Sequence, residues 1–251
     1  MFDLQGKVAI VTGGNGGIGL AMAQGLAKAG ARIAVVGRNP DKLQEAVASL
    51  SKGGVEARAY AADVCDEAAV AGLVAQVAFD FGRLDILVNN AGINIRKPVQ
   101  ELALSEWNAV MDTNLTSAFL CCRAAWPHLK KQGGKVINIG SMTSIFGAAY
   151  APAYSASKGG IVQLTRALAT SWAADNIQVN AVLPGWIDTN MTQKSRVDVR
   201  GLHERILART PAGRWGKPQD LAGIAVFLSS AASDFITGTA IPVDGGYSVQ
   251  A

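Results

Sequence analysis

The chain has 251 residues, of which 49% are hydrophobic and 17% charged, so it can fill a large core and does not have the composition of a disordered protein. Its net charge of +4 is spread along the sequence without basic runs, and its three cysteines and two isolated histidines form no disulfide framework or metal-ligand pattern. No apolar stretch has the length of a membrane span, and the amino terminus enters a strand pattern without a signal peptide. We therefore expect a soluble, cytoplasmic protein that binds no nucleic acid, membrane or metal.

Strand and helix patterns alternate along the whole chain without a linker. Short β-branched runs predict strands, and periodic apolar stretches between them predict helices. This alternation is typical of an α/β fold, a single-domain doubly wound (Rossmann-type) parallel β-sheet with helices on both faces. We therefore expect residues 1–251 to form one domain. The first six expected strands lie at residues 7–11, 32–36, 56–61, 86–88, 136–139 and 178–183.

A glycine-rich turn follows the first expected strand. Residues 12–19 read TGGNGGIG and lead directly into a helical pattern. Two registers of glycines satisfy the dinucleotide-binding spacing: Gly14, Gly16 and Gly19, or Gly13, Gly17 and Gly19. In either register the backbone can approach a pyrophosphate at the positive end of the helix dipole. Because strand, turn and helix occur in the required order, we expect a dinucleotide to bind here.

The second expected strand ends at Gly37 and Arg38. Asn39 is the expected N-cap of the next helix, with Pro40 at its first position. In sites that prefer NAD, an acidic residue near this point holds the ribose hydroxyls, whereas an arginine accommodates the 2′-phosphate of NADP. Arg38 therefore favours NADP(H) over NAD(H), although a solvated loop arginine would give the same sequence.

A long helical pattern follows the fourth expected strand. Ser105 is its expected N-cap, and the pattern runs to about residue 131 with Asn114 inside it. An asparagine within a helix is a mild misfit, because its side chain competes for backbone hydrogen bonds. The commonest outcome for such a residue is exposure to solvent, so the residue type alone predicts no role for Asn114.

The stretch from Lys135 to Lys158 brings a serine, a tyrosine and a lysine within reach of one another. Ser141 follows a buried strand and so lies at the carboxyl edge of the sheet, where open α/β sheets bind ligands. Tyr154 and Lys158 lie one turn apart on the same face of the next helix. We expect the ammonium group to lower the pKa of Tyr154, which would then act as a general acid/base while Ser141 hydrogen-bonds the substrate oxygen. A plain helical pair and a capping serine would leave the same pattern.

Together, the motifs resemble those of the short-chain dehydrogenase/reductase family, in its order and spacing over nearly the whole chain. The matching residues are Thr12-Gly13-x-x-x-Gly17-Ile18-Gly19, Asn89-Asn90-Ala91-Gly92, Asn114, Ser141, Tyr154-x-x-x-Lys158 and Pro184-Gly185. The resemblance implies that Tyr154 is the catalytic acid/base and that Lys158 lowers its pKa and holds the nicotinamide ribose. It also implies that Ser141 orients the substrate and that Asn114 holds a proton-relaying water.

The resemblance selects the second glycine register and implies a set of cofactor contacts. Asp63 and Val64 correspond to adenine contacts, and Asn90 to the residue beside the adenosine ribose. Thr189 and the Ile187 backbone correspond to contacts with the pyrophosphate or the carboxamide. The full expected set is Gly13, Asn15, Gly17, Ile18, Gly19, Arg38, Asp63, Val64, Asn90, Ala91, Gly92, Tyr154, Lys158, Pro184, Gly185, Ile187 and Thr189. Many NADP-dependent members carry a basic residue at the position of Gly16, so the NADP preference rests on Arg38 alone.

The resemblance also covers the carboxyl-terminal part of the chain. Residues 186–211 lie where the family has a mobile substrate lid, and residues 241–246 resemble its last strand and closing turn. The lid cations Lys194, Arg196 and Arg200 could meet an anionic substrate or simply be solvated. Members of the family usually form tetramers through the long helices and this end of the chain, so a homotetramer is expected.

Residues 94–98, 140–142 and 210–216 resemble the gluconate and 2-deoxygluconate dehydrogenase branch of the family. Arg96 could pair with a sugar-acid carboxylate bidentately, or it could cap a loop. The expected function is an NAD(P)(H)-dependent oxidoreductase that interconverts a secondary alcohol and a ketone on a gluconate-type sugar acid or polyol. A 3-oxoacyl-thioester (acyl-carrier-protein) reductase shares the core motifs. A nucleotide-sensing regulator of the same fold is the alternative outside enzymes, although such proteins usually lose the tyrosine or the lysine.

Overall fold

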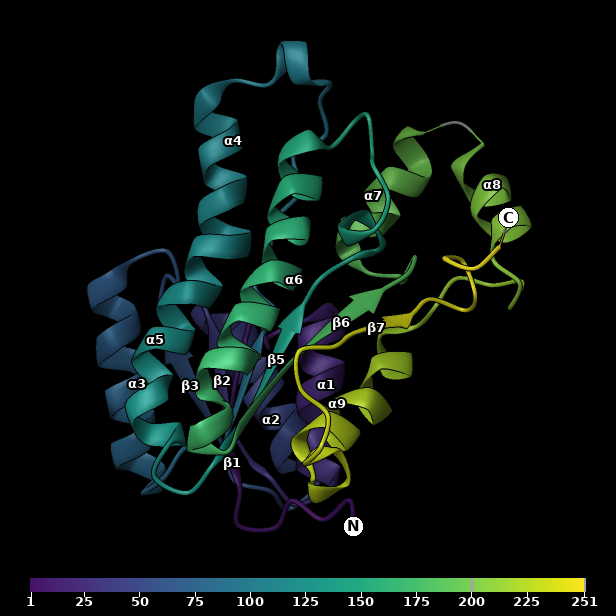
Figure 1. The fold of residues 1–251 in the computed structure, drawn as a ribbon. Coiled ribbons are helices and arrows are strands. Elements are labelled where there is room, and N and C mark those ends of the chain that lie inside the picture. Colours follow the sequence, from purple (N-terminus) through teal and green to yellow (C-terminus); the bar gives the residue numbers. More distant parts are fainter. Residues whose placement is uncertain (200, 251) are drawn as a thin grey trace.

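The computed structural model describes residues 1–199 and 201–250 of the chain (Figure 1). Within these ranges seven parallel strands form one sheet in the order β3-β2-β1-β4-β5-β6-β7. The strands are β1 (Val8–Thr12), β2 (Arg32–Gly37), β3 (Ala57–Ala61), β4 (Ile86–Asn89), β5 (Gly134–Ile139), β6 (Ile177–Pro184) and β7 (Ala240–Val243). The strand order reverses between β1 and β4, so a ligand crevice is expected where the carboxyl ends of these two strands separate.

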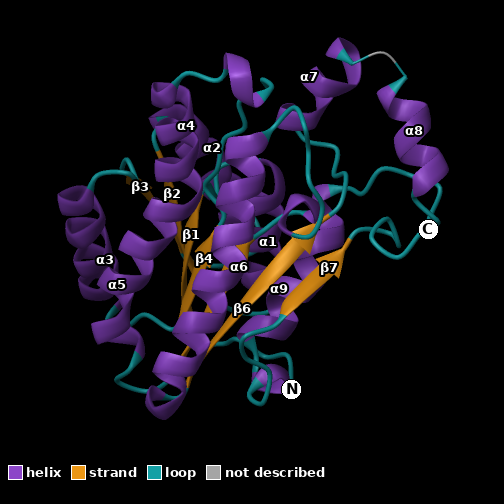
Figure 2. Cartoon of the chain, turned by 45° about the horizontal axis from the view of Figure 1, so that its top comes forward, coloured by secondary structure: helices purple, strands orange, loops and turns teal. Residues whose placement is uncertain are grey.

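Helices cover both faces of the sheet (Figure 2). They are α1 (Gly17–Lys28), α2 (Pro40–Ser51), α3 (Glu67–Phe81), α4 (Leu104–Met111), α5 (Ser117–Leu129), α6 (Pro152–Trp172), α7 (Asn190–Asp198), α8 (Leu202–Arg209) and α9 (Ala222–Ser229). Helices α1, α2 and α9 pack on one face, and α3, α5 and α6 on the other, while α7 and α8 stand beyond the carboxyl ends of the strands (Figure 1). The predicted doubly wound α/β fold is confirmed.

The central strands are apolar throughout because each face of the sheet carries its own core. Ala9 and Val11 face the layer formed by α1, α2 and α9. Val8 and Ile10 face the layer formed by α3 and α5. All five residues of β1 are buried, as expected for a parallel sheet covered on both sides. This double burial fixes the register, because a slip by one residue would exchange the two faces.

Two predicted helix starts have different outcomes. Asn39 caps α2 as expected, and its Oδ1 accepts a hydrogen bond from the Lys42 backbone N–H at 3.0 Å. The prediction for Ser105 is wrong, because the N-cap of α4 is Ala103, two residues earlier. The reason is the carboxylate of Glu106, which accepts the Ala103 backbone N–H at 3.0 Å and so supplies the capping acceptor itself.

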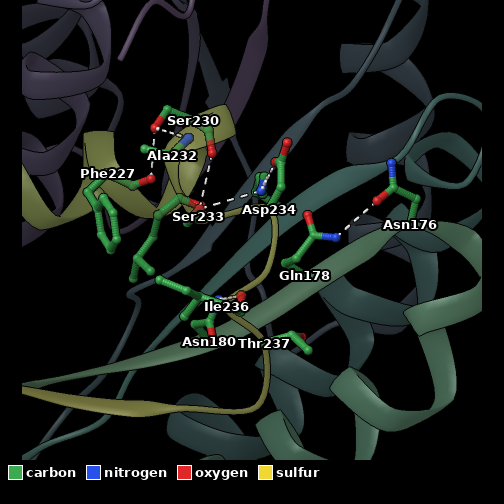
Figure 3. A network of polar contacts seen from close by, with 12 residues as sticks. Asn176, Gln178, Asn180, Phe227, Ser230, Ala232, Ser233, Asp234, Ile236 and Thr237 are labelled. Carbon is green, nitrogen blue, oxygen red and sulfur yellow. Dashed lines mark hydrogen bonds and ion pairs between the residues drawn. The ribbon is translucent and has the colours of Figure 1, made fainter. Parts of the chain in front are cut away.

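Polar contacts at the amino-terminal edge of the sheet anchor the segment that leads into β7 (Figure 3). Lys135 of β5 donates to Asp234 at 2.7 Å. Asn180 of β6 donates to the Ile236 carbonyl at 2.8 Å. These contacts close the edge opposite the ligand crevice.

In the described part of the chain, no helix is both long enough and apolar enough to cross a membrane.

Candidate active site

The glycine turn after β1 lies at the carboxyl edge of the sheet, against the end of β4. Gly13 and Gly17 have positive φ angles of 61° and 51°, which favour glycine. A Cβ atom at Gly13 would stand 2.9 Å from Asn90 Nδ2, so the turn has no room for a side chain there. Asn90 donates to the Gly13 carbonyl at 3.2 Å, and Thr12 Oγ1 accepts the Asn90 backbone N–H at 2.9 Å. The turn is thus fixed to β4 with its backbone facing the crevice.

A cleft of about 550 Å³ opens over this turn, and we call it the glycine-turn cleft. Most of the expected cofactor contacts line it: Gly13, Asn15, Gly17, Ile18, Asn90, Ala91, Gly92, Tyr154, Lys158, Pro184, Gly185, Ile187 and Thr189. Gly19 lies beneath the turn, where a Cβ atom would collide with Asn90 and the Gly13 carbonyl. A glycine turn with no room for a Cβ atom at Gly13 or Gly19, at the start of α1, fits the pyrophosphate of a dinucleotide.

The remaining expected cofactor contacts, Arg38, Asp63 and Val64, line an adjoining cavity of about 270 Å³, the Arg38 cavity. The side chain of Arg38 is 73% exposed, and its nearest carboxylate, Asp63, is 3.9 Å away. A Cβ atom at Gly37 would stand 2.9 Å from Asn15 Nδ2. The position that would carry an acidic residue in an NAD-preferring site is therefore closely packed against the glycine turn.

Ser141 and Tyr154 lie together as predicted. Ser141 follows β5, and Tyr154 is in the first turn of α6. Burial raises the pKa of Tyr154 above its ordinary value, while a hydrogen bond with the Ser141 hydroxyl and the positive charge of Arg96 act in the opposite direction. The phenol therefore favours its neutral form, ready to give its proton to an oxygen beside it.

Lys158 lies over the Tyr154 ring but gives its hydrogen bond to the end of β5. It is 4% exposed, and its Nζ atom donates to the Ile139 carbonyl at 2.7 Å and stands 5.7 Å from the centroid of the tyrosine ring. Burial lowers the pKa of Lys158 to about 8. The predicted lowering of the Tyr154 pKa is thus wrong in direction for this structure, because burial raises that pKa, and the cation that opposes the rise is Arg96.

Asn114 is buried, at 2% exposure, so the solvent-facing alternative is wrong. It lies in a π-helical turn, Asp112–Thr116, that joins α4 to α5. Its Oδ1 atom accepts the Ile93 N–H at 2.8 Å, while its Nδ2 atom donates to the Ile93 carbonyl at 2.9 Å and to Ser157 Oγ at 3.1 Å. The side chain thus ties the chain after β4 to α6, and the sequence signalled it only as a misfit within a helix.

A second cavity, of about 140 Å³, adjoins the glycine-turn cleft, and we call it the Arg96 cavity. The two cavities share Ser141, Tyr154, Pro184, Gly185, Met191 and Thr192. The guanidinium group of Arg96 lies 5.4 Å from the centroid of the Tyr150 ring, and no carboxylate pairs with it in the described residues. Sequence reasoning missed several residues of this wall, among them Asn94, Thr143, Tyr150, Trp186 and Tyr247. They come from four separate segments that only the fold brings together.

The segment predicted as a lid contains α7 and α8. Arg196 of α7 pairs with Asp188 at 3.6 Å and stacks over the Trp215 ring at 4.0 Å. Trp215 Nε1 donates to His203 Nδ1 of α8 at 3.0 Å. Arg196 thus connects α7 to Asp188 and Trp215 and does not line the Arg96 cavity. Arg200 and the Lys194 side chain lie outside the described residues.

No cluster of three or more acidic, histidine or cysteine side chains suited to a metal occurs in the described ranges.

Comparison with known proteins places these features in a family. A sequence model of the family described as Enoyl-(Acyl carrier protein) reductase matches residues 13–248. The chain is 44% identical over 248 residues to a 2-dehydro-3-deoxy-D-gluconate 5-dehydrogenase of Formosa agariphila, covering 98% of this chain and 94% of that protein. It is 40% identical over 251 residues to a gluconate 5-dehydrogenase of Gluconobacter oxydans, covering 100% and 98%.

A solved structure agrees with these sequence matches. The gluconate 5-dehydrogenase of Burkholderia cenocepacia J2315, in complex with NADP and tartrate, has a TM-score of 0.95 at 38% identity, covering 100% of this chain and 98% of that one. The matches span nearly the full length of every chain compared, and the resemblance predicted from the motifs is confirmed. The chain therefore belongs to the short-chain dehydrogenase/reductase family.

Proposed function

We propose that this protein is an NAD(P)(H)-dependent oxidoreductase that interconverts a secondary alcohol and a ketone on a sugar acid of the gluconate type. One observation carries the proposal: Ser141 and Tyr154 lie where the glycine-turn cleft meets the Arg96 cavity. The first space suits a dinucleotide, and the second has an unpaired cation at its wall. The names of the relatives, gluconate and 2-dehydro-3-deoxy-D-gluconate 5-dehydrogenases, support this substrate class.

In this proposal each residue of the junction has a defined task. In reduction the neutral Tyr154 phenol gives its proton to the carbonyl oxygen, and in oxidation the Tyr154 phenolate takes the proton of the carbinol oxygen. The Ser141 hydroxyl hydrogen-bonds the same oxygen and steadies its developing charge. Lys158 would hold the ribose of the cofactor, and Asn114 keeps the chain after β4 in place. A bound nicotinamide would accept or supply the hydride.

Arg96 is proposed to bind the carboxylate of the substrate. Its guanidinium group is held over Tyr150 at the wall of the cavity, and its charge already acts on the Tyr154 phenol. Bidentate pairing with a carboxylate would neutralise this charge and fix the distance between the acid group and the reacting carbon. An acyl thioester offers no carboxylate here, so Arg96 favours the sugar acid over the thioester alternative.

Two finer assignments belong to the same proposal. We infer a preference for NADP(H), which rests on the exposed Arg38 and on the absence of an acidic side chain at Gly37. We infer a homotetramer, which is supported by the exposed apolar side chains Leu104 of α4 and Phe119 of α5, at 73% and 44% exposure. Light scattering on the purified protein tests the second inference, and a monodisperse monomer would overturn it. A cytoplasmic location stays a prediction from the sequence.

The function is tested with a substrate panel. Gluconate-type sugar acids, neutral polyols, simple secondary alcohols and 3-oxoacyl thioesters are each supplied with NAD(H) and with NADP(H), and absorbance of the reduced nicotinamide is followed. The proposal expects the highest kcat/KM for a sugar acid with NADP(H). Turnover confined to acyl thioesters would support the reductase alternative. Nucleotide binding without turnover of any substrate would support the regulator.

The carboxylate contact is tested in the same assay. Arg96→Ala should lower kcat/KM for a sugar acid by roughly 10- to 100-fold, because it removes hydrogen bonds to a charged group. It should affect a neutral polyol much less. Arg58→Ala on the edge strand β3 is the matched control, and it should leave kcat/KM for both substrates unchanged. Equal losses on both substrates in Arg96→Ala would remove the carboxylate assignment.

A further inference from the structure

Two residues in the wall of the Arg96 cavity each carry a side-chain polar atom that has no hydrogen-bond partner. The two atoms are Asn94 Oδ1 and Thr143 Oγ1, and both are buried. Among the described residues, other buried side-chain atoms also lack partners, but none of those residues lines this cavity. A buried polar atom without a partner destabilises the folded protein, and native structures rarely keep one without a reason. The two atoms therefore point to a ligand that completes their hydrogen bonds.

Both residues are held rigidly beside the reacting groups. Thr143 follows Ser141 by two positions, and its backbone N–H donates to the Ser141 hydroxyl at 3.2 Å. Asn94 follows Ile93, whose N–H and carbonyl are both bound by Asn114. The backbone that carries the two side chains is thus fixed by the same contacts that order the site. Such preorganisation is what a specificity contact requires.

The chemistry of the two atoms selects one class of partner. An amide oxygen only accepts hydrogen bonds, and a threonine hydroxyl both donates and accepts. The cavity wall also contains the apolar side chains of Met142 and Phe146, which cannot pair with either atom. A hydroxyl group can donate to the amide oxygen and exchange a hydrogen bond with the threonine. An alkyl chain would leave both atoms unpaired, and a site built to bind a hydroxyl discriminates strongly against an analogue that lacks it.

We propose that Asn94 and Thr143 are specificity-determining residues that hydrogen-bond hydroxyl groups of a polyhydroxylated substrate, next to the carbon that is oxidised. The proposal rests on the proposed function and deepens it. Arg96 would bind the acid group of the substrate, whereas Asn94 and Thr143 would hydrogen-bond hydroxyl groups along its carbon chain. Together they would separate a sugar acid from an acyl chain and from a sugar acid that lacks the recognised hydroxyl.

The test compares Thr143→Val, which removes the hydroxyl at nearly constant shape, with Thr143→Ser, which keeps it. kcat/KM is measured for gluconate and for a series of singly deoxygenated gluconates, and Asn94→Leu is measured in parallel. Thr143→Val should lower kcat/KM for gluconate at least 10-fold, but less than 3-fold for the one analogue that lacks the recognised hydroxyl. Thr143→Ser should stay within 3-fold of the wild type on gluconate. Thr170→Val, an exposed threonine of α6, is the control.

Thermal unfolding of the ligand-free variants gives a second readout that needs no turnover. Because Thr143 Oγ1 has no partner within the protein, Thr143→Val should melt at the wild-type temperature or above it. A clear drop would show an internal partner and overturn the proposal. A second result would also overturn the proposal: the wild type turns over gluconate, but Thr143→Val lowers kcat/KM by the same factor for gluconate and for every analogue. The proposed function would then still stand. Absence of sugar-acid turnover in the wild type would overturn both.

Discussion

Replacing the buried Lys158 by methionine tests the electrostatics of the site through stability. The side chain is 4% exposed, and burial lowers its pKa from the ordinary value of 10.5 to about 8. In the folded state the ammonium form of Lys158 is therefore disfavoured by about 3 kcal/mol. Methionine has a similar length and carries no charge, but it gives up the hydrogen bond to Ile139, which costs about 1 kcal/mol. We therefore expect Lys158→Met to be about 2 kcal/mol more stable than the wild type at pH 7.

The pH dependence follows from the sign of the shift. Between pH 8 and 10.5 the unfolded state keeps the Lys158 proton while the folded state releases it, so the unfolded state binds more protons. Stability of the wild type therefore rises with pH across this window, by up to about 3 kcal/mol. Below pH 8 both states carry the proton and the full cost is present. The advantage of Lys158→Met should be greatest at neutral pH and vanish towards pH 10.

The assay is urea unfolding of the ligand-free proteins between pH 6.5 and 10, at one fixed protein concentration so that any association contributes equally. Lys42→Met on the exposed face of α2 is the matched control and should change stability by less than about 0.5 kcal/mol at every pH. A variant Lys158→Met that is less stable than the wild type at pH 7, or a difference that does not change with pH, would refute the reasoning.

Two further changes test the cofactor end and the support of the site. Arg38→Asp should weaken NADP binding at least 10-fold in fluorescence titrations while NAD binding holds or improves, because the carboxylate repels a 2′-phosphate and suits free ribose hydroxyls. An equal change for both nucleotides would contradict the assignment. Asn114→Ala should lower the free energy of unfolding by roughly 2–4 kcal/mol, because it leaves the Ile93 N–H and carbonyl without their partner. Chemical denaturation measures this loss, and a change below about 0.5 kcal/mol would contradict the clamp.

Much of the fold could be predicted because the strands are buried on both faces. Continuous apolar runs such as Val8–Thr12 have no other common explanation when glycine turns and helix caps flank them. The helix boundaries were less predictable where two caps compete. Ser105 had the right residue type, but the Glu106 carboxylate accepts the Ala103 N–H, and the N-cap lies two residues earlier.

Parts of the candidate site whose geometry follows from sequence spacing were predictable. The pKa values and contacts that depend on the folded surroundings were not. One helical turn places Tyr154 and Lys158 on one face, and the structure keeps them there. The pKa values depend on burial and on Arg96, which approaches from the segment after β4, so local sequence could not give their direction. The π-helical turn at Asn114 and the unpaired atoms of the Arg96 cavity arise from packing between distant segments.

The central claim is that the Tyr154 hydroxyl carries the proton of the substrate oxygen. Its most direct test is kcat for oxidation of a gluconate-type acid in Tyr154→Phe, with the NADP dissociation constant measured on the same preparation. We predict a fall in kcat of roughly 10²- to 10⁴-fold with a much smaller change in the dissociation constant, because Tyr154→Phe keeps the ring that lines the cleft. A kcat within threefold of the wild type would show that another group moves the proton.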